Sequence, residues 1–228
     1  MVTAVEGGAK KGIKLDFKQL VAVEPSLQLL AALMARVRWK SNTKLASLVL
    51  CRFPVWLNAD ILAGPGGGKP VPAREFLALC GQLVPAATLS TGFTTGSEGR
   101  YTSTQLNLLY DTLNQASPFL LNHWEEFQKV LIPRHDQAGV RVPVTLPARA
   151  SLSTRSQPAL LALLARADSE ARFPLSLTLW SGAADTVDKA ELAELVRAAG
   201  RERVYQDLPW QSALHTTRQA ANSDRHTL

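Results

Sequence analysis

Two short apolar segments of this chain end in polar residues that could bind a charged ligand. Asp16 and Lys18 close the first segment, and Asn58 and Asp60 close the second. Residues two apart on a β-strand share a face, so each pair would present both side chains to the same side of a sheet. Two carboxylates, an amide and an ammonium gathered there suit a divalent cation and an anionic ligand. These four residues are the leading candidates for a functional site.

The elements that would position these residues follow from an alternation of apolar runs with helical spacing. Nearly continuous apolar runs are typical of parallel strands buried on both faces, and helices between them make right-handed crossovers. The runs predict strands over 12–17, 53–59, 87–90, 142–146, 175–180 and 204–208. Helical spacing predicts helices over 23–37, 72–83, 102–115, 157–167 and 185–199.

The number of predicted strands, about six, is smaller than the eight of a closed barrel of this type. Two alternatives follow: an open sheet, or a barrel without two of its units. The apolar run at 12–17 lies so close to the start of the chain that it favours the second. We therefore expect an α/β fold, an incomplete TIM-like (β/α) barrel of about six parallel strands with outer helices.

The C-terminal ends of parallel strands converge on one rim, where barrel enzymes and binders keep their sites. We expect Arg149, after the strand at 142–146, and Trp180, at the end of 175–180, to join the first four residues around one concavity. An arginine there can clamp an anion, and a tryptophan can wall a pocket.

Each candidate also has a purely structural interpretation. The pair at 16 and 18 could be an ion pair that holds neighbouring strands. The pair at 58 and 60 could cap the loop that follows, because Asx side chains bond nearby backbone amides. Arg149 could form a surface salt bridge, and Trp180 could pack in the core.

Composition excludes several classes of protein. The chain has 228 residues, 46% of them hydrophobic, which is enough for one domain over 1–210 with a polar tail at 211–228. Its net charge of +6 comes from scattered basic residues, so we expect no nucleic-acid partner. No apolar run reaches the ~20 residues of a membrane span, and residues 1–14 lack the apolar core of a signal peptide. Cys51 and Cys80 are expected to be buried thiols.

Short motifs spread along the chain carry a resemblance to a known family. They read GIKLDFK at 12–18, VEPSL at 23–27, PVWLNADIL at 54–62, ATLS and GFTTG within 87–96, PVTLPARA at 143–150 and SLTLW at 176–180. In this order they resemble the menorin family. The resemblance implies a barrel similar to the glycerophosphodiester phosphodiesterase and sphingomyelinase D superfamily. It also implies an extracellular protein that acts with cell-surface or adhesion partners in patterning dendrites; a cytoplasmic location is the alternative.

The resemblance also implies roles for several residues. Asp16 is similar to the third carboxylate ligand of a Mg²⁺ or Ca²⁺ ion in a complete barrel, and Lys18 is similar to a catalytic group that stabilises phosphoryl oxygens. Asn58 and Asp60 would orient the ligand or a metal-bound water. Asp207 is the weakest candidate, because the strand around it departs from the family pattern.

Other departures concern whole segments. Family members begin with two further strands, similar to those that carry a catalytic histidine and a Glu/Asp metal pair in the phosphodiesterases, and we expect this chain to lack both. Insertions near 39–51 and 117–139 interrupt the pattern. We therefore expect a truncated isoform. The four histidines fall outside the matching motifs: His123, His135, His215 and His226.

Two functions of different classes remain. One is a non-catalytic binding or adhesion-related module of the menorin family with a protein partner. The other is a metal-dependent phosphodiesterase-like hydrolase for phospholipid-type substrates. A phosphodiester mechanism needs a proton shuttle and enough carboxylates to fix the cation. Because we expect this chain to retain only part of that set, the sequence favours the non-enzymatic function.

Overall fold

The computed structural model describes residues 12–40, 54–116 and 142–208. These residues form one sheet of six parallel strands, whose order across the sheet is their order along the chain. The strands are β1 (Ile13–Phe17), β2 (Val55–Ala63), β3 (Thr88–Thr94), β4 (Val144–Arg149), β5 (Leu175–Trp180) and β6 (Val204–Asp207). The α-helices between them are α1 (Val23–Lys40), α3 (Ala73–Leu83), a helix over 103–116, α5 (Ala150–Thr154), α6 (Gln157–Glu170) and α7 (Lys189–Ala199).

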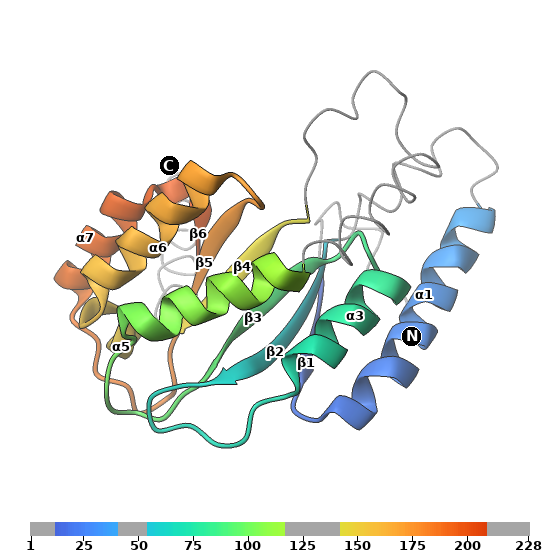
Figure 1. The fold of residues 1–228 in the computed structure, drawn as a ribbon, viewed down its shortest axis with the longest axis horizontal. Coiled ribbons are helices and arrows are strands. Elements are labelled where there is room, and N and C mark those ends of the chain that lie inside the picture. The colour runs from blue at the N-terminus through green and yellow to red at the C-terminus, as the bar shows by residue number, and fades with distance from the viewer. Residues whose placement is uncertain (1–11, 41–53, 117–141, 209–228) are drawn as a thin grey trace, which may run out of the picture.

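The helices lie in chain order along one side of the sheet (Figure 1). The side chains of β2 alternate as this arrangement requires. Leu57, Ala59 and Ile61 are buried in the hydrophobic core. Asn58 and Asp60 point to the opposite side of the sheet, away from the helices, and line a cavity there.

The sheet is strongly curled, and one aromatic contact measures the curl. Trp56 of β2 and Tyr205 of β6 meet edge to face, with ring centroids 5.0 Å apart. Four strand spacings of about 4.8 Å would separate these two strands by about 19 Å in a flat sheet. Strands four apart lie opposite one another in an eight-stranded barrel. The described residues thus form an incomplete (β/α) barrel with β1 and β6 at its edges, and the predicted fold class is confirmed.

Three strands extend beyond the ends predicted at 59, 90 and 146, to Ala63 in β2, Thr94 in β3 and Arg149 in β4. The polar residues Asn58 and Asp60 do not end β2, because their backbones continue to pair with β3. Asp60 pairs with Gly92 of β3, and Ala63 pairs with Thr94. Asn58 and Asp60 therefore lie inside β2 and not at its end.

Helix starts follow from capping side chains. The helix over 103–116 begins with a reciprocal pair: the Gln105 amide N–H donates to Thr102 Oγ1 at 3.2 Å, and the Thr102 N–H donates to Gln105 Oε1 at 3.0 Å. Helix α7 begins at Lys189 and not at the predicted 185, because Asp188 is its cap.

Several predictions fall on residues outside the described ranges. The insertion near 39–51 begins in the last turn of α1, and the remainder of it lies outside. The insertion at 117–139, the tail at 211–228, all four histidines and Cys51 also lie outside the described residues. Cys80 is buried, as predicted. None of the helices that the structure describes has the length and apolar character needed to cross a membrane.

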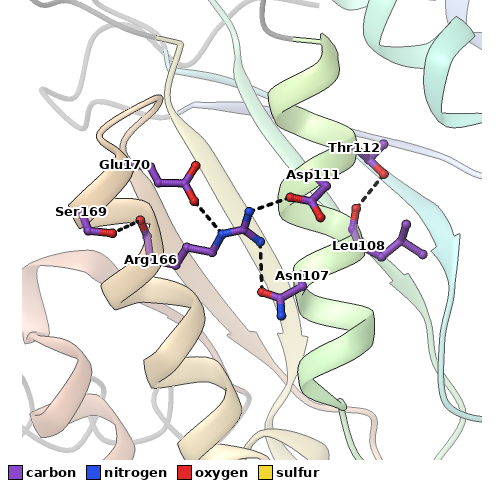
Figure 2. A network of polar contacts seen from close by, with 7 residues as sticks. All are labelled: Asn107, Leu108, Asp111, Thr112, Arg166, Ser169 and Glu170. Atoms are coloured by element: carbon purple, nitrogen blue, oxygen red, sulfur yellow. Dashed lines mark hydrogen bonds and ion pairs between the residues drawn. The ribbon is translucent and has the colours of Figure 1, made fainter.

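A polar network ties two of the outer helices together (Figure 2). Arg166 of α6 donates to Asp111 Oδ1 at 2.7 Å and to Asn107 Oδ1 at 3.1 Å, both on the neighbouring helix. Its Nε donates to Glu170, one turn along α6, at 2.7 Å. The guanidinium also lies 4.4 Å from the ring centroid of Tyr110. One arginine thereby joins two helices that follow different strands.

We expect Arg166→Ala to lower the melting temperature by roughly 2–4 °C, which corresponds to about 1 kcal/mol in a chain of this size. The loss combines ion pairs of about 0.2–1 kcal/mol with a cation–π contact of about 0.5–1 kcal/mol. Arg166→Lys should recover only part of it, because an ammonium cannot reproduce the forked contacts. Scanning calorimetry measures the effect. The control is Arg197→Ala, which removes an exposed pair with Glu194 inside α7; an equal fall in that control would contradict the prediction.

Candidate functional site

A cavity of about 970 Å³ opens on the concave side of the sheet. Its wall includes residues of β1 and β6, the two edges of the sheet, as well as residues of β2 and β5. Five of the residues chosen from the sequence line it together: Asp16, Lys18, Asn58, Asp60 and Trp180. Arg149 does not line it. The structure thus gathers most of the candidates on one concave surface.

A chain of polar contacts crosses three strands at one side of the cavity. The Ser90 hydroxyl of β3 donates to Asn58 Oδ1 at 2.7 Å, and Asn58 Nδ2 donates to Asp16 Oδ1 at 2.7 Å. The second oxygen of Asp16 lies 3.0 Å from Lys18 Nζ, with both of these side chains well exposed. The ion pair that was the structural alternative for Asp16 and Lys18 is therefore present. Together, the Lys18 ammonium and the Asn58 amide engage both carboxylate oxygens of Asp16.

Asp60 is partly buried and has no such partners. The described residues offer its carboxylate no hydrogen bond or ion pair. Asp60 pairs in register with Gly92 of β3, and the register between the two strands shifts directly after it, between Asp60 and Leu62. Burial raises the pKa of Asp60 above its ordinary value; Lys18 opposes this rise and Asp16 adds to it.

Arg149 lies beside the cavity and is committed to other protein groups. Its Nε and Nη2 donate to the two oxygens of Asp185 at 2.8 and 2.5 Å, and its Nη1 donates to the Gly96 carbonyl at 2.6 Å. The hydrogen bonds between the two side chains raise the pKa of the Arg149 guanidinium and lower the pKa of the Asp185 carboxyl. The guanidinium also lies 5.4 Å from the ring centroid of Trp180. Arg149 therefore joins the loops that follow β3 and β5.

Sequence reasoning did not select two residues of this region as site candidates, and it ranked a third as the weakest. Asp185 was assigned to a helix, although a carboxylate between a strand and a helix is a common partner for a rim arginine. Lys14 of β1 lines the cavity, and its position two residues before Asp16 puts both on one face. Asp207, the weakest candidate, also lines the cavity. It stands beside Trp180 in the β5–β6 register.

The described side chains do not fit a centre for Mg²⁺ or Ca²⁺ by themselves. Such cations take several oxygen ligands, usually including more than one carboxylate. Within the described ranges, no group of three or more His, Cys, Asp or Glu side chains is placed to hold a metal ion. Asp16, the predicted ligand, has the Lys18 ammonium on one oxygen and the Asn58 amide on the other.

Comparison with known proteins places the chain in a family. Residues 2–213 match the family model described as the Menorin N-terminal domain. The chain belongs to the menorin family. It is 31% identical over 202 residues to Protein FAM151B of Homo sapiens, an alignment that covers 88% of this menorin chain and 59% of that protein. The chain thus spans only part of the length of this relative. No solved structure matches it.

We expect Asp60→Asn to raise the melting temperature at pH 7 and to leave it nearly unchanged near pH 3. Because the pKa of Asp60 is raised in the fold, the folded state binds the proton more tightly than the unfolded state does. Stability therefore falls as the pH rises from the ordinary pKa of 3.8 through the folded value. An amide has no charge to desolvate, so the variant escapes this loss.

Calorimetry from pH 3 to pH 7 tests this sign. The control is Glu75→Gln, which removes one charge from an exposed position in the first turn of α3. It should not raise the melting temperature at pH 7, because a carboxylate there interacts favourably with the helix dipole. An Asp60→Asn variant less stable than the parent at pH 7 would show that the surroundings favour the ionised carboxylate.

Proposed function

We propose that this chain is a non-catalytic binding domain and that it takes its ligand in the concave cavity. The observation that carries the proposal is that protein groups bind both carboxylate oxygens of Asp16. A carboxylate that holds a catalytic cation must present an oxygen to it. Here Asn58 Nδ2 lies 2.7 Å from one oxygen of Asp16 and Lys18 Nζ lies 3.0 Å from the other. The groups that would do phosphodiester chemistry are bound to one another.

Other features of the cavity support binding. Its volume, about 970 Å³, falls within the common range of about 300–1,000 Å³ for ligand sites. Trp180 gives it an aromatic wall, and Asp60 gives it a carboxylate that has no hydrogen bond or ion pair with the described residues. A few polar groups on such a wall are what orient a ligand.

Family membership supports the partner class and the location in this proposal. The partner in this proposal is a protein of the cell-surface or adhesion type, met outside the cell and used in patterning dendrites. Nucleic acid has no place in it, because the basic residues are scattered along the chain.

The alternative is a metal-dependent phosphodiesterase-like hydrolase for phospholipid-type substrates. One observation favours it: Asp16, Lys18 and Asp60 share one cavity on the concave side of a (β/α) sheet, where barrel enzymes of this architecture keep their chemistry. In that function Asp16 would hold the cation and Lys18 would stabilise phosphoryl oxygens.

Incubation of the purified chain with Mg²⁺ or Ca²⁺ and a glycerophosphodiester or sphingomyelin decides between the two. We expect no turnover above buffer, since acid–base assistance contributes about 10²–10⁴-fold and Asp16 and Lys18 are bound to each other. Turnover that Asp16→Ala abolishes and Glu75→Gln retains would establish the hydrolase.

A second measurement tests binding itself. The labelled chain should bind saturably to the surface of intact neuronal cells, and Trp180→Ala should weaken this binding at least tenfold. The matched control is Leu108→Ala, which removes an exposed apolar side chain from an outer helix. Equal binding by the two variants would remove the cavity from the proposal.

A further inference from the structure

We infer that the cavity receives a primary ammonium group and that Asp60 is its counter-charge. The inference rests on the proposed function, because it names the class of ligand for the same cavity. Three observations lead to it: the charge balance of the lining residues, the surroundings of the Asp60 carboxylate, and the aromatic wall.

Charge balance leaves one carboxylate of the cavity without a cation. Among the described residues, three acidic and two basic side chains line it: Asp16, Asp60, Asp207, Lys14 and Lys18. Asp16 and Lys18 neutralise each other at 3.0 Å. Lys14 and Asp207 are exposed on the two edge strands, where water and salt screen them. Asp60 remains, and it is the partly buried one.

The surroundings of Asp60 call for a positively charged donor. Charges removed from water in proteins are normally paired, yet the described residues give this carboxylate neither a hydrogen bond nor an ion pair. Lys18 Nζ is within ion-pair distance of Asp16 but not of Asp60. The pairing of Asp60 with Gly92 in the ladder directs its side chain to the same side of the sheet as that of Asn58. A ligand ammonium would supply both the missing charge and up to three N–H donors for the two free oxygens.

The aromatic wall suits the carbon chain of such a ligand. Trp180 lines the cavity, and its ring is backed by the Arg149 guanidinium at 5.4 Å. Arg149 is itself fixed by Asp185, so the ring presents a firm apolar surface. The methylene groups next to an ammonium pack well on such a surface. A quaternary ammonium fits less well, because it has no N–H to give to the free oxygens of Asp60.

Titration with small probes tests the inference, with the backbone amide and indole signals of the chain followed by NMR. n-Butylammonium should bind saturably with a dissociation constant on the order of 1 mM. N-Butylacetamide, which is neutral, and tetramethylammonium should bind at least tenfold more weakly. Asp60→Asn should weaken n-butylammonium binding at least tenfold, while Glu75→Gln, on the outer surface, should leave it unchanged.

Equal affinity for n-butylammonium and its neutral counterpart would overturn the inference. So would equal binding by the parent protein and Asp60→Asn, or equal affinity for tetramethylammonium. Two further probes separate the sources of an ammonium. Tighter binding of Nα-acetyl-lysine methylamide supports a lysine side chain of a protein partner, and tighter binding of glucosamine supports an amino sugar.

Failure of this inference differs from failure of the proposed function. If no amine binds but Trp180→Ala still abolishes binding to cells, the ammonium assignment is wrong and the binding function stands. If the chain turns over a phosphodiester through Asp16, the proposed function is wrong whatever the amine titration shows.

Discussion

The contact between Trp56 and Tyr205 sets the shape on which the cavity depends. The two rings meet at 5.0 Å although three strands separate β2 from β6 in the sheet. In a flat sheet the edge strands β1 and β6 would be about 24 Å apart, too far for one small molecule to reach both. Because Trp56 precedes Asn58 and Tyr205 precedes Asp207, the aromatic pair lies on the N-terminal side of these two cavity residues.

Contacts between loops stabilise the rim of the cavity at the C-terminal ends of the strands. Arg149 bonds Asp185 in the segment after β5 and the Gly96 carbonyl in the segment after β3. Gly96 in turn packs against the loop that follows β2, where a Cβ would stand 2.8 Å from the Gly66 carbonyl oxygen. The absence of a side chain at Gly96 thus allows the loops after β2 and β3 to touch, and Arg149 joins the loop after β5 to them. The ring of Trp180 lies against this arginine, with its centroid 5.4 Å from the guanidinium carbon.

The sequence predicted those parts of the fold that depend on local periodicity. All six strands are present where apolar runs indicated them, and Asn58 and Asp60 share a face because strands have a period of two. Strand ends were wrong in β2, β3 and β4, since pairing with neighbours continues a strand through polar residues. The curl, the Arg149–Asp185 pair and the isolation of Asp60 could not be predicted. They depend on how segments that are distant in the sequence meet in the fold.

The inner side of the sheet shows why Asp60 is the informative residue. Two pairs of polar neighbours there are satisfied across strands: Ser90 donates to Asn58, and the hydroxyls of Thr145 and Thr178 lie 2.7 Å apart. The Ser181 hydroxyl, which also lines the cavity, is buried without a hydrogen-bond partner among the described residues. Charged groups withdrawn from water are normally hydrogen-bonded or paired. Burial raises the pKa of Asp60, so that ionising this carboxylate costs more free energy in the fold than in the unfolded chain. Among the described residues no hydrogen bond or ion pair offsets the burial of a carboxylate at this position, and a positive group on a ligand would offset it.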